Sequence, residues 1–263
     1  NQRNLLIFGR FRWFTHIFYY LCTKIQKRML IGRDNERKIL QDALADEYSQ
    51  FIAVYGRRRV GKTFLINEVL GDYMAFRHTG LSPYDRKRKT SLKDQLQNFH
   101  FSLIRHGMDG CSQPKSWMEA FFMLEQLLER KFNGSRQVVF IDELPWMDTA
   151  RSGFLTALEA FWNGWGNAQH HLFLVVCGSA TSWMMRNIVN NKAGLHKRAT
   201  HTMHLRPFSL GQTEEYLKSK KFRWPRIAIL QAYMVLGGVP YYLSLLDPKK
   251  NVPDNIDTLF FSA

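Results

Sequence analysis

The chain has 263 residues and a formal net charge of +15, from 37 lysines and arginines against 22 aspartates and glutamates. This length allows one large domain, or one core and part of a second, which buries about 70–75% of its unfolded surface and needs no disulfide or metal to fold. With 45% apolar and 14% aromatic residues, the composition excludes a disordered or low-complexity chain.

The positive charge is unevenly distributed along the chain. Residues 1–30 hold six basic residues and no acidic one, whereas the rest of the chain holds 31 basic and 22 acidic residues. The net charge by itself therefore does not indicate a nucleic-acid partner.

The N-terminal segment contains an apolar stretch, Trp13 to Cys22, that is about half the length needed to span a bilayer. No small-residue cleavage site follows it, so a signal peptide fits poorly. Its mixed basic and aromatic residues would suit a membrane surface, but an extension outside the natural start fits better, because Met29 would be a natural beginning. We expect residues 1–29 to be a basic and aromatic extension, disordered or non-native, without an integral membrane span.

The three cysteines are Cys22, Cys111 and Cys177. They are widely spaced and form no C-x-x-C or Cys/His cluster, which argues against a disulfide framework and against a zinc site. We therefore expect a cytoplasmic location.

In the first half of the chain, helices and strands are predicted to alternate. The expected elements are a helix over 35–48 with Asp34 as its N-cap, a strand over 51–55, a helix from Lys62, a strand over 73–78, a basic loop over 80–91, a helix from the Ser91-x-x-Asp94 capping box to about Arg105, and a helix over 116–132.

The second half continues this alternation and then becomes helical. The expected elements are a strand over 138–141, a helix over 154–163, strands over 172–177 and 202–205, and helices from the Ser209-x-x-Gln212 cap, over 225–236 and over 240–246. This order predicts an α/β fold with a five-stranded parallel sheet and helices on both faces. We expect residues 30–207 to form this core and residues 208–263 a small helical lid subdomain.

One motif carries most of the chemistry. The Walker A pattern G-x-x-x-x-G-K-[ST] is matched by residues 56–63, GRRRVGKT, between an apolar strand and a helix. The glycines let backbone N–H groups form an anion cradle, Lys62 should reach the β and γ phosphates, and the Thr63 hydroxyl should ligate Mg²⁺. The residues predicted to bind nucleotide here are Gly56, Arg57, Arg58, Arg59, Val60, Gly61, Lys62, Thr63 and Phe64.

A second element ends the apolar run 138–141 in two carboxylates, Asp142 and Glu143. In open parallel sheets, ligands bind beside the carboxyl ends of the strands. We therefore interpret this pair as a Walker B element, in which Asp142 holds Mg²⁺ through water and Glu143 activates the attacking water. An acidic turn after any strand is the alternative, and the upstream Walker A motif disfavours it.

ATP is favoured over GTP because a guanine-binding Asn-Lys-x-Asp motif is missing. The nearest match is Asn191-Lys192-Ala193-Gly194, and Pro145 stands where a GTPase would have glycine.

Taken together, these motifs resemble those of the archaeal-type ATPases, an AAA-like, STAND-related class of P-loop ATPases. The resemblance runs from Leu30 to Ala263. The matching segments are Ile31-Gly32-Arg33-Asp34-x-Glu36, GRRRVGKT, Phe140 to Trp146, Cys177 to Ala180, Gly194-Leu195-x-x-Arg198, Leu205 to Leu210, and Gly237 to Leu243.

The resemblance implies roles for further residues. Ile31, Gly32 and Arg33 would line the adenine pocket, Ser179 would sense the γ phosphate, and the turn ending at Pro240 would bring the lid against the nucleotide. Arg198 would touch phosphate in cis or from a neighbouring subunit, although it lies in a basic stretch that also suits a solvated surface. Ordinary turns explain Ser179 and the Gly237–Pro240 segment equally simply.

The chain departs from the family pattern at both ends. Residues 1–30 have no counterpart, and the family usually continues into a winged-helix domain beyond the region that ends at Ala263. We therefore expect the chain to be truncated at its C-terminus.

Several functions remain open at this point. The first is an ATP-binding, ATP-hydrolysing switch, with an ATP-binding regulator of negligible hydrolysis as a variant. The second is a nucleic-acid-associated ATPase module, since basic clusters occur at 86–89 and 218–226, although such runs are more often solvated faces. The third is a small-molecule kinase, which the carboxylate pair disfavours. The partner, whether DNA or protein, and the oligomeric state are not specified by the sequence.

Overall fold

A computed structural model describes residues 30–83, 88–191, 194–195 and 197–261. The expectation for residues 1–29 lies outside the described residues. Contacts divide the chain between Leu30 and Ile31, and the part from Ile31 onward forms one compact unit.

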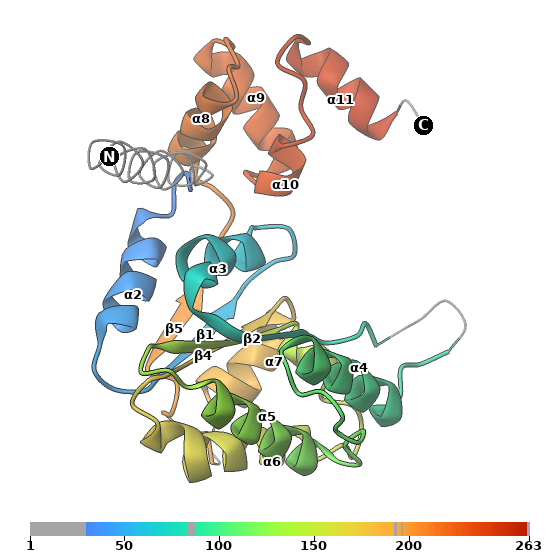
Figure 1. Cartoon of the computed structure of the whole chain (residues 1–263). Coiled ribbons are helices and arrows are strands. Elements are labelled where there is room, and N and C mark those ends of the chain that lie inside the picture. The colour runs from blue at the N-terminus through green and yellow to red at the C-terminus, as the bar shows by residue number, and fades with distance from the viewer. Residues whose placement is uncertain (1–29, 84–87, 192–193, 196, 262–263) are drawn as a thin grey trace, which may run out of the picture. The chain divides into compact units, whose positions relative to one another are not determined.

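From Asp34 to His204, strands and helices follow one another along the described residues, as the sequence pattern predicts (Figure 1). The elements are α2 (Asp34–Ala45), β1 (Gln50–Tyr55), α3 (Lys62–Leu70), β2 (Met74–Thr79), α4 (Leu92–Arg105), α5 (Trp117–Lys131), β3 (Gln137–Asp142), α6 (Phe154–Ala160), β4 (Leu172–Gly178), α7 (Thr181–Met184) and β5 (His201–His204). Helices α6 and α7 continue as short π-helical turns over Phe161–Trp165 and Met185–Val189.

The sheet has the order β2-β3-β4-β1-β5, and every neighbouring pair of strands is parallel. All residues of β3 and β4 are buried, because helices cover both faces, which is typical of parallel sheets. Figure 1 shows α3 on one face and α5 with α6 on the other. The α/β fold predicted from the sequence is confirmed.

Alternating strand residues build the larger part of the core. Phe51, Val139 and Leu174 point to the face covered by α4, α5 and α6, where they join one apolar cluster with residues such as Phe99 and Phe121. The period of two therefore sends the intervening strand residues to the face covered by α2 and α3. The strand ends that carry Gly56, Glu143 and Ser179 are held in place from both sides.

The C-terminal helices are α8 (Leu210–Ser219), α9 (Arg226–Leu236), α10 (Pro240–Leu243) and α11 (Val252–Phe260). They have a small apolar cluster of their own, which consists of Phe208, Leu217, Phe222, Ile229, Leu236, Leu243 and Leu246. Helix α11 was not predicted, although Asn251 caps it through a hydrogen bond from the Asp254 N–H, at 2.8 Å, and Pro253 stands in its first turn.

Some local predictions were wrong in detail. Asp34 is the first residue of α2, and the preceding residue, Arg33, occupies the N-cap without a side-chain cap bond. The apolar residues Ile39 and Phe64 are each 37% exposed, because the buried stripes of α2 and α3 run through Leu40 and Leu65. Helix α2 also ends three residues earlier than expected.

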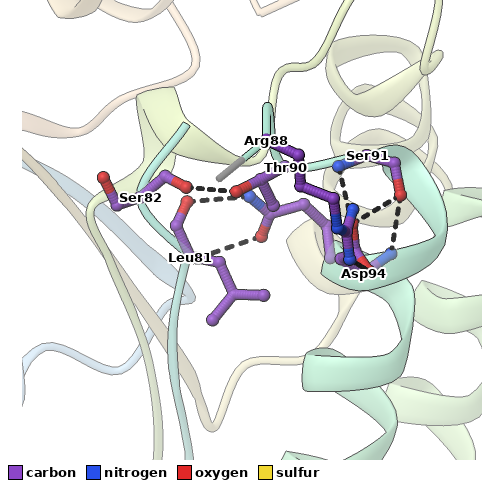
Figure 2. Close-up of polar contacts among 7 residues, drawn as sticks. Leu81, Ser82, Arg88, Thr90, Ser91 and Asp94 are labelled. Carbon is purple, nitrogen blue, oxygen red and sulfur yellow. Dashed lines mark hydrogen bonds and ion pairs between the residues drawn. The ribbon is translucent and has the colours of Figure 1, made fainter. Parts of the chain in front are cut away.

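The capping box at the start of α4 formed as predicted. The Ser91 side chain accepts the Asp94 N–H, and the Asp94 carboxylate accepts the Ser91 N–H at 2.8 Å. Figure 2 shows these contacts with the Arg88 guanidinium, which donates two hydrogen bonds to Asp94, at 2.6 and 2.7 Å. The same view shows Thr90 donating to the Ser82 carbonyl, which closes the loop after β2.

Candidate functional site

The loop 56–63 leaves the carboxyl end of β1, the strand between β4 and β5. Gly56 has φ +147°, and a Cβ there would lie 2.2 Å from the Leu205 carbonyl oxygen that follows β5. Gly61, the N-cap of α3, has φ +92°. The two glycines of the motif are therefore required for different reasons. Gly56 allows a close backbone approach, and Gly61 allows a left-handed turn.

Lys62 is the first residue of α3 and is only 6% exposed. Its Nζ donates to the carbonyl of Gly56 at 2.9 Å and to that of Arg57 at 3.1 Å. The ammonium group is thus folded over the inside of the loop, next to the N-terminal end of a helix. A buried cation and a helix N-terminus together favour an anion at this point.

Thr63 and Asp142 come together from different parts of the chain. The Thr63 hydroxyl donates to Asp142 Oδ2 at 2.6 Å, and the Asp142 side chain, at the end of β3, is largely buried. Asp142 Oδ1 accepts the N–H of Glu143 at 2.9 Å, which orients the carboxylate. A hydroxyl beside a carboxylate is an all-oxygen donor set, and this chemistry fits Mg²⁺.

Glu143 and Ser179 also lie together. Glu143 Oε2 accepts hydrogen bonds from the Ser179 N–H at 3.2 Å and from the Ser179 hydroxyl at 2.8 Å. Glu143 has φ +48°, a left-handed backbone conformation that directs its side chain toward the end of β4. Because β4 lies between β1 and β3, Ser179 stands between the loop 56–63 and the carboxylate pair.

Arg58 extends this contact from the loop. Its Nε donates to the Ser179 hydroxyl oxygen at 3.4 Å, and its guanidinium lies 5.3 Å from the centre of the Trp146 ring. The sequence placed Arg58 in the loop and Ser179 after a strand, but their contact depends on the strand order.

The Cys177 thiol is fully buried on β4, next to these groups. Burial raises its pKa, and the nearby Asp142 carboxylate raises it further. Within the described part of the chain, Cys177 and Cys111 are free thiols. A buried thiol whose pKa is raised is a poor nucleophile, so Cys177 acts as a packing residue.

The turn at residues 31–33 contacts both the first turn of α8 and the segment that leads into it. The Gly32 carbonyl accepts from Gln212 Nε2 at 2.6 Å. The Arg33 guanidinium, 5% exposed, donates to the carbonyls of Val60 at 3.2 Å and Arg206 at 2.7 Å. It also lies 4.8 Å from the centre of the Phe208 ring, and burial lowers its pKa. Arg33 therefore joins the loop 56–63 to the segment 206–208.

Pro240 begins α10, which reaches the same loop. The Tyr241 N–H donates to the Arg59 carbonyl at 3.4 Å, and the Arg59 guanidinium lies 4.3 Å from the centre of the Tyr241 ring. Gln212, Tyr241 and Tyr242 were not predicted as site residues. Their residue types do not indicate a binding site, since surface tyrosines and a helix-capping glutamine are common.

Other sequence-predicted residues lie elsewhere. Arg198 is exposed in a turn closed by its own N–H to the Leu195 carbonyl, at 3.1 Å. Part of the 86–89 cluster and Lys192 lie outside the described residues. Among the residues that the structure describes, no three His, Cys, Asp or Glu side chains gather into a metal cluster. No helix in the described ranges is long and apolar enough to cross a membrane.

Comparison with known proteins places this geometry in a family. The model of an ATPase domain found predominantly in Archaea matches residues 30–246. An uncharacterised protein of Methanocaldococcus jannaschii is 24% identical over 225 residues, which are 82% of this chain and 43% of that protein. The chain thus spans less than half the length of this relative.

Solved structures share the fold at low sequence identity. The Walker-type ATPase of Pyrococcus abyssi has a TM-score of 0.61 at 17% identity, over 87% of this chain and 72% of its own. The Aeropyrum pernix ORC2 protein has a TM-score of 0.53 at 14% identity, over 89% and 71%. A STAND protein with a tetratricopeptide repeat sensor from Pyrococcus horikoshii has a TM-score of 0.51 at 14% identity, over 83% of this chain and 30% of its own. With the family model matching most of the sequence, this chain belongs to the ATPase domains found predominantly in Archaea.

Proposed function

We propose that the chain binds ATP with Mg²⁺ at the loop 56–63 and hydrolyses it, as a nucleotide-driven switch. The observation that carries this proposal is the 2.6 Å hydrogen bond between Thr63 and Asp142, which brings a Walker A hydroxyl to a Walker B carboxylate. Mg²⁺ in phosphoryl-transfer sites is held by one or two protein oxygens together with phosphate oxygens and water. When bound, Mg²⁺ supplies charge neutralisation at the β and γ phosphates.

We assign phosphate binding to the loop backbone and to Lys62. Backbone N–H groups of the loop would surround the β phosphate, and the Lys62 ammonium would exchange the carbonyls of Gly56 and Arg57 for phosphate oxygens. This exchange is favourable because a phosphate carries full negative charge, whereas a carbonyl carries only a partial one. The ADPNP and ADP complexes of the Aeropyrum pernix ORC2 protein support an adenine nucleotide here.

Water activation is assigned to Glu143. Both hydrogen bonds from Ser179 go to Oε2, so Oε1 is the oxygen that we assign to the attacking water. Ser179 would orient the carboxylate and contact the γ phosphate, and Arg58 stands close enough to Ser179 to share that phosphate. The adenine pocket is assigned to Ile31, Gly32 and Arg33, and the turn that ends at Pro240 would bring the lid against the nucleotide.

The arrangement also supports a second function, an ATP-binding regulator with negligible hydrolysis. Glu143 already accepts two hydrogen bonds from Ser179, which restrain a base that must turn toward water. In both functions we propose residues 30–207 as the ATPase core and 208–263 as its lid, in a cytoplasmic protein.

A nucleic-acid partner is the weaker candidate. Lys218 and Arg226 of the 218–226 cluster already contact the Glu214 carboxylate, at 2.7 and 3.3 Å. Affinity for DNA that falls steeply with added salt would favour such a partner.

The test measures ATP affinity and single-turnover hydrolysis of the full chain with Mg²⁺. Lys62→Ala should weaken ATP binding about a hundredfold, because it removes the cation of the cradle. Glu143→Gln should keep ATP binding but slow hydrolysis by about 10²–10⁴-fold, the usual contribution of a general base. Lys115→Ala, which removes an exposed lysine before α5, is the matched control.

The outcomes separate the candidates. Equal affinity in wild type, Lys62→Ala and Lys115→Ala would overturn the nucleotide site itself. Tight ATP binding with equally slow hydrolysis in wild type and Glu143→Gln would instead select the regulator.

A further inference from the structure

Arg59, the third arginine of the loop 56–63, makes contacts unlike those of Arg58. Arg58 reaches Ser179 and Trp146 on the sheet side, whereas Arg59 reaches α10. Arg59 also has φ +69°, a conformation that an arginine seldom adopts. The backbone turn at Arg59 therefore separates a part of the loop that meets the sheet from a part that meets the C-terminal helices.

Arg59 contacts α10 through both its backbone and its side chain. Its carbonyl accepts the Tyr241 N–H at 3.4 Å. Its guanidinium lies 4.3 Å from the centre of the Tyr241 ring and 5.5 Å from that of Tyr242, and Nη1 donates to the Tyr242 hydroxyl at 3.3 Å. The two rings pack edge to face, with centres 5.6 Å apart, so the planar cation meets a preformed aromatic pair.

The start of α10 also contacts the segment before α8. The Gly238 carbonyl accepts the Phe208 N–H at 2.8 Å, and a Cβ on Gly238 would lie 2.2 Å from the Phe208 carbonyl oxygen. Phe208 in turn stacks with Arg33, which donates to the carbonyl of Val60. Residues 59 and 60, neighbours in the loop, are thus both linked to the segment 206–242.

We propose that Arg59 is a positioning residue that couples phosphate binding in the loop 56–63 to the position of α10. This inference rests on the proposed function, because it needs a nucleotide in the loop. Phosphate binding requires the loop N–H groups to turn inward and stay there, and the Arg59 backbone is part of that turn. The carbonyl and guanidinium of Arg59 transmit this ordering to Tyr241 and Tyr242. Arg59 therefore serves the lid, whereas Lys62 serves the phosphate.

The decisive variant is Arg59→Gly. Glycine adopts φ +69° without strain and keeps the carbonyl that accepts from Tyr241, so only the side chain is lost. Lys221→Gly is the matched control, because Lys221 is an exposed basic residue with φ +67° in the turn after α8. Tyr242→Phe removes the hydroxyl alone and tests the hydrogen bond apart from the ring contacts.

Amide hydrogen exchange of the full chain, without nucleotide and with saturating ATP and Mg²⁺, gives the readout. In the wild type, ATP should slow exchange both in the loop 56–63 and in residues 239–246. Without nucleotide, Arg59→Gly should exchange about two- to fivefold faster over 239–246, the size expected for an exposed cation–π contact. With ATP, Arg59→Gly should keep the slowing in the loop and lose it over 239–246, whereas Lys221→Gly should behave like wild type.

Two results would overturn this inference without overturning the proposed function. One is unchanged ATP-dependent slowing over 239–246 in Arg59→Gly, and the other is an equal loss in Lys221→Gly. If ATP slows exchange nowhere in the wild type, the proposed function fails and this inference fails with it. ATP protection of the loop in the wild type therefore distinguishes the two failures.

Discussion

The sheet core and the C-terminal helices are held together in different ways. Every residue of β3 and β4 is buried, and Asp142, Glu143 and Ser179 stand at the ends of these strands. In α9, by contrast, Met234 is 76% and Ile227 is 63% exposed, and the helices share only a small apolar cluster. The groups proposed to be catalytic are fixed where the backbone is packed from both faces, whereas the helices proposed to move are held by a few polar and aromatic contacts.

The largest effect is expected from replacing two glycines that each lie close to a backbone carbonyl oxygen. A Cβ on Gly56 or on Gly238 would lie 2.2 Å from a carbonyl oxygen, that of Leu205 or of Phe208. We expect Gly56→Ala to lower the free energy of unfolding by about 3 kcal/mol or more, because neither the sheet nor the loop can shift. Gly238→Ala should cost much less, because α10 can move, and both are measured by urea denaturation.

Gly134→Ala provides the control for backbone strain. Gly134 has φ +86° with no atom near its missing Cβ, so it isolates the cost of the left-handed conformation. Equal losses for Gly56→Ala and Gly238→Ala would show that the helices are as rigid as the sheet.

Acid should destabilise the core through His78 on β2. Burial, together with the positive charges of Arg105 and His106, lowers its pKa to about 3. The unfolded chain takes up this proton near pH 6.5, so stability is lost as the pH falls from 6.5 toward 3, by about 1.4 kcal/mol per pH unit. Between pH 7 and pH 5, His78 should therefore account for about 2 kcal/mol, measured by urea unfolding at both values.

The variant His78→Gln removes this titration and should flatten the acid dependence. His201→Gln, at an exposed position on the edge strand β5, is the control. An unchanged slope in His78→Gln would contradict the prediction, whatever its effect on stability at pH 7.

A smaller effect of opposite sign is expected from Glu125 on α5. Burial, and next the neighbouring Glu129 carboxylate, raise its pKa to about 7. The folded chain therefore keeps this proton to a higher pH than the unfolded chain, and stability falls as the pH rises from about 4.5 to 7. Glu125→Gln should gain about 1 kcal/mol at pH 8, allowing for solvent screening, and nothing at pH 4. A gain that is equal at both values would exclude this ionisation as its cause.

The smallest effect is expected in the C-terminal helices. Hydrogen bonds from Lys218 and Arg226, whose side chains are both exposed, lower the pKa of Glu214. Its stabilisation is present at neutral pH and is lost as the pH falls through that lowered pKa. Because salt and water screen such pairs, Glu214→Gln should leave the thermal midpoint unchanged at 0.15 M salt. A clear drop there would mean that these ion pairs hold the helices more firmly than their apolar contacts do.

Local sequence signals predicted the elements of the core well, because each depends on few residues. The capping boxes at Ser91 and Ser209 and the apolar run 138–141 all gave the expected structure. Helix α11 was missed although its start, Asn251-x-Pro253-Asp254, carries a capping signal. The exposure of Ile39 and Phe64 depends on which side of each helix meets the sheet, and periodicity alone leaves an uncertainty of one position.

The sequence by itself determined the two motifs and the strands to which they are attached. Each position of G-x-x-x-x-G-K-T between a strand and a helix requires its residue type for a local physical reason. Which groups meet was decided only by the tertiary structure. The contacts of Thr63 with Asp142, of Ser179 with Glu143 and of Arg59 with Tyr241 join residues 36 to 182 positions apart. They exist because β4 inserts between β1 and β3 and because the chain returns from β5 to the loop 56–63, and strand order is not encoded in any single segment.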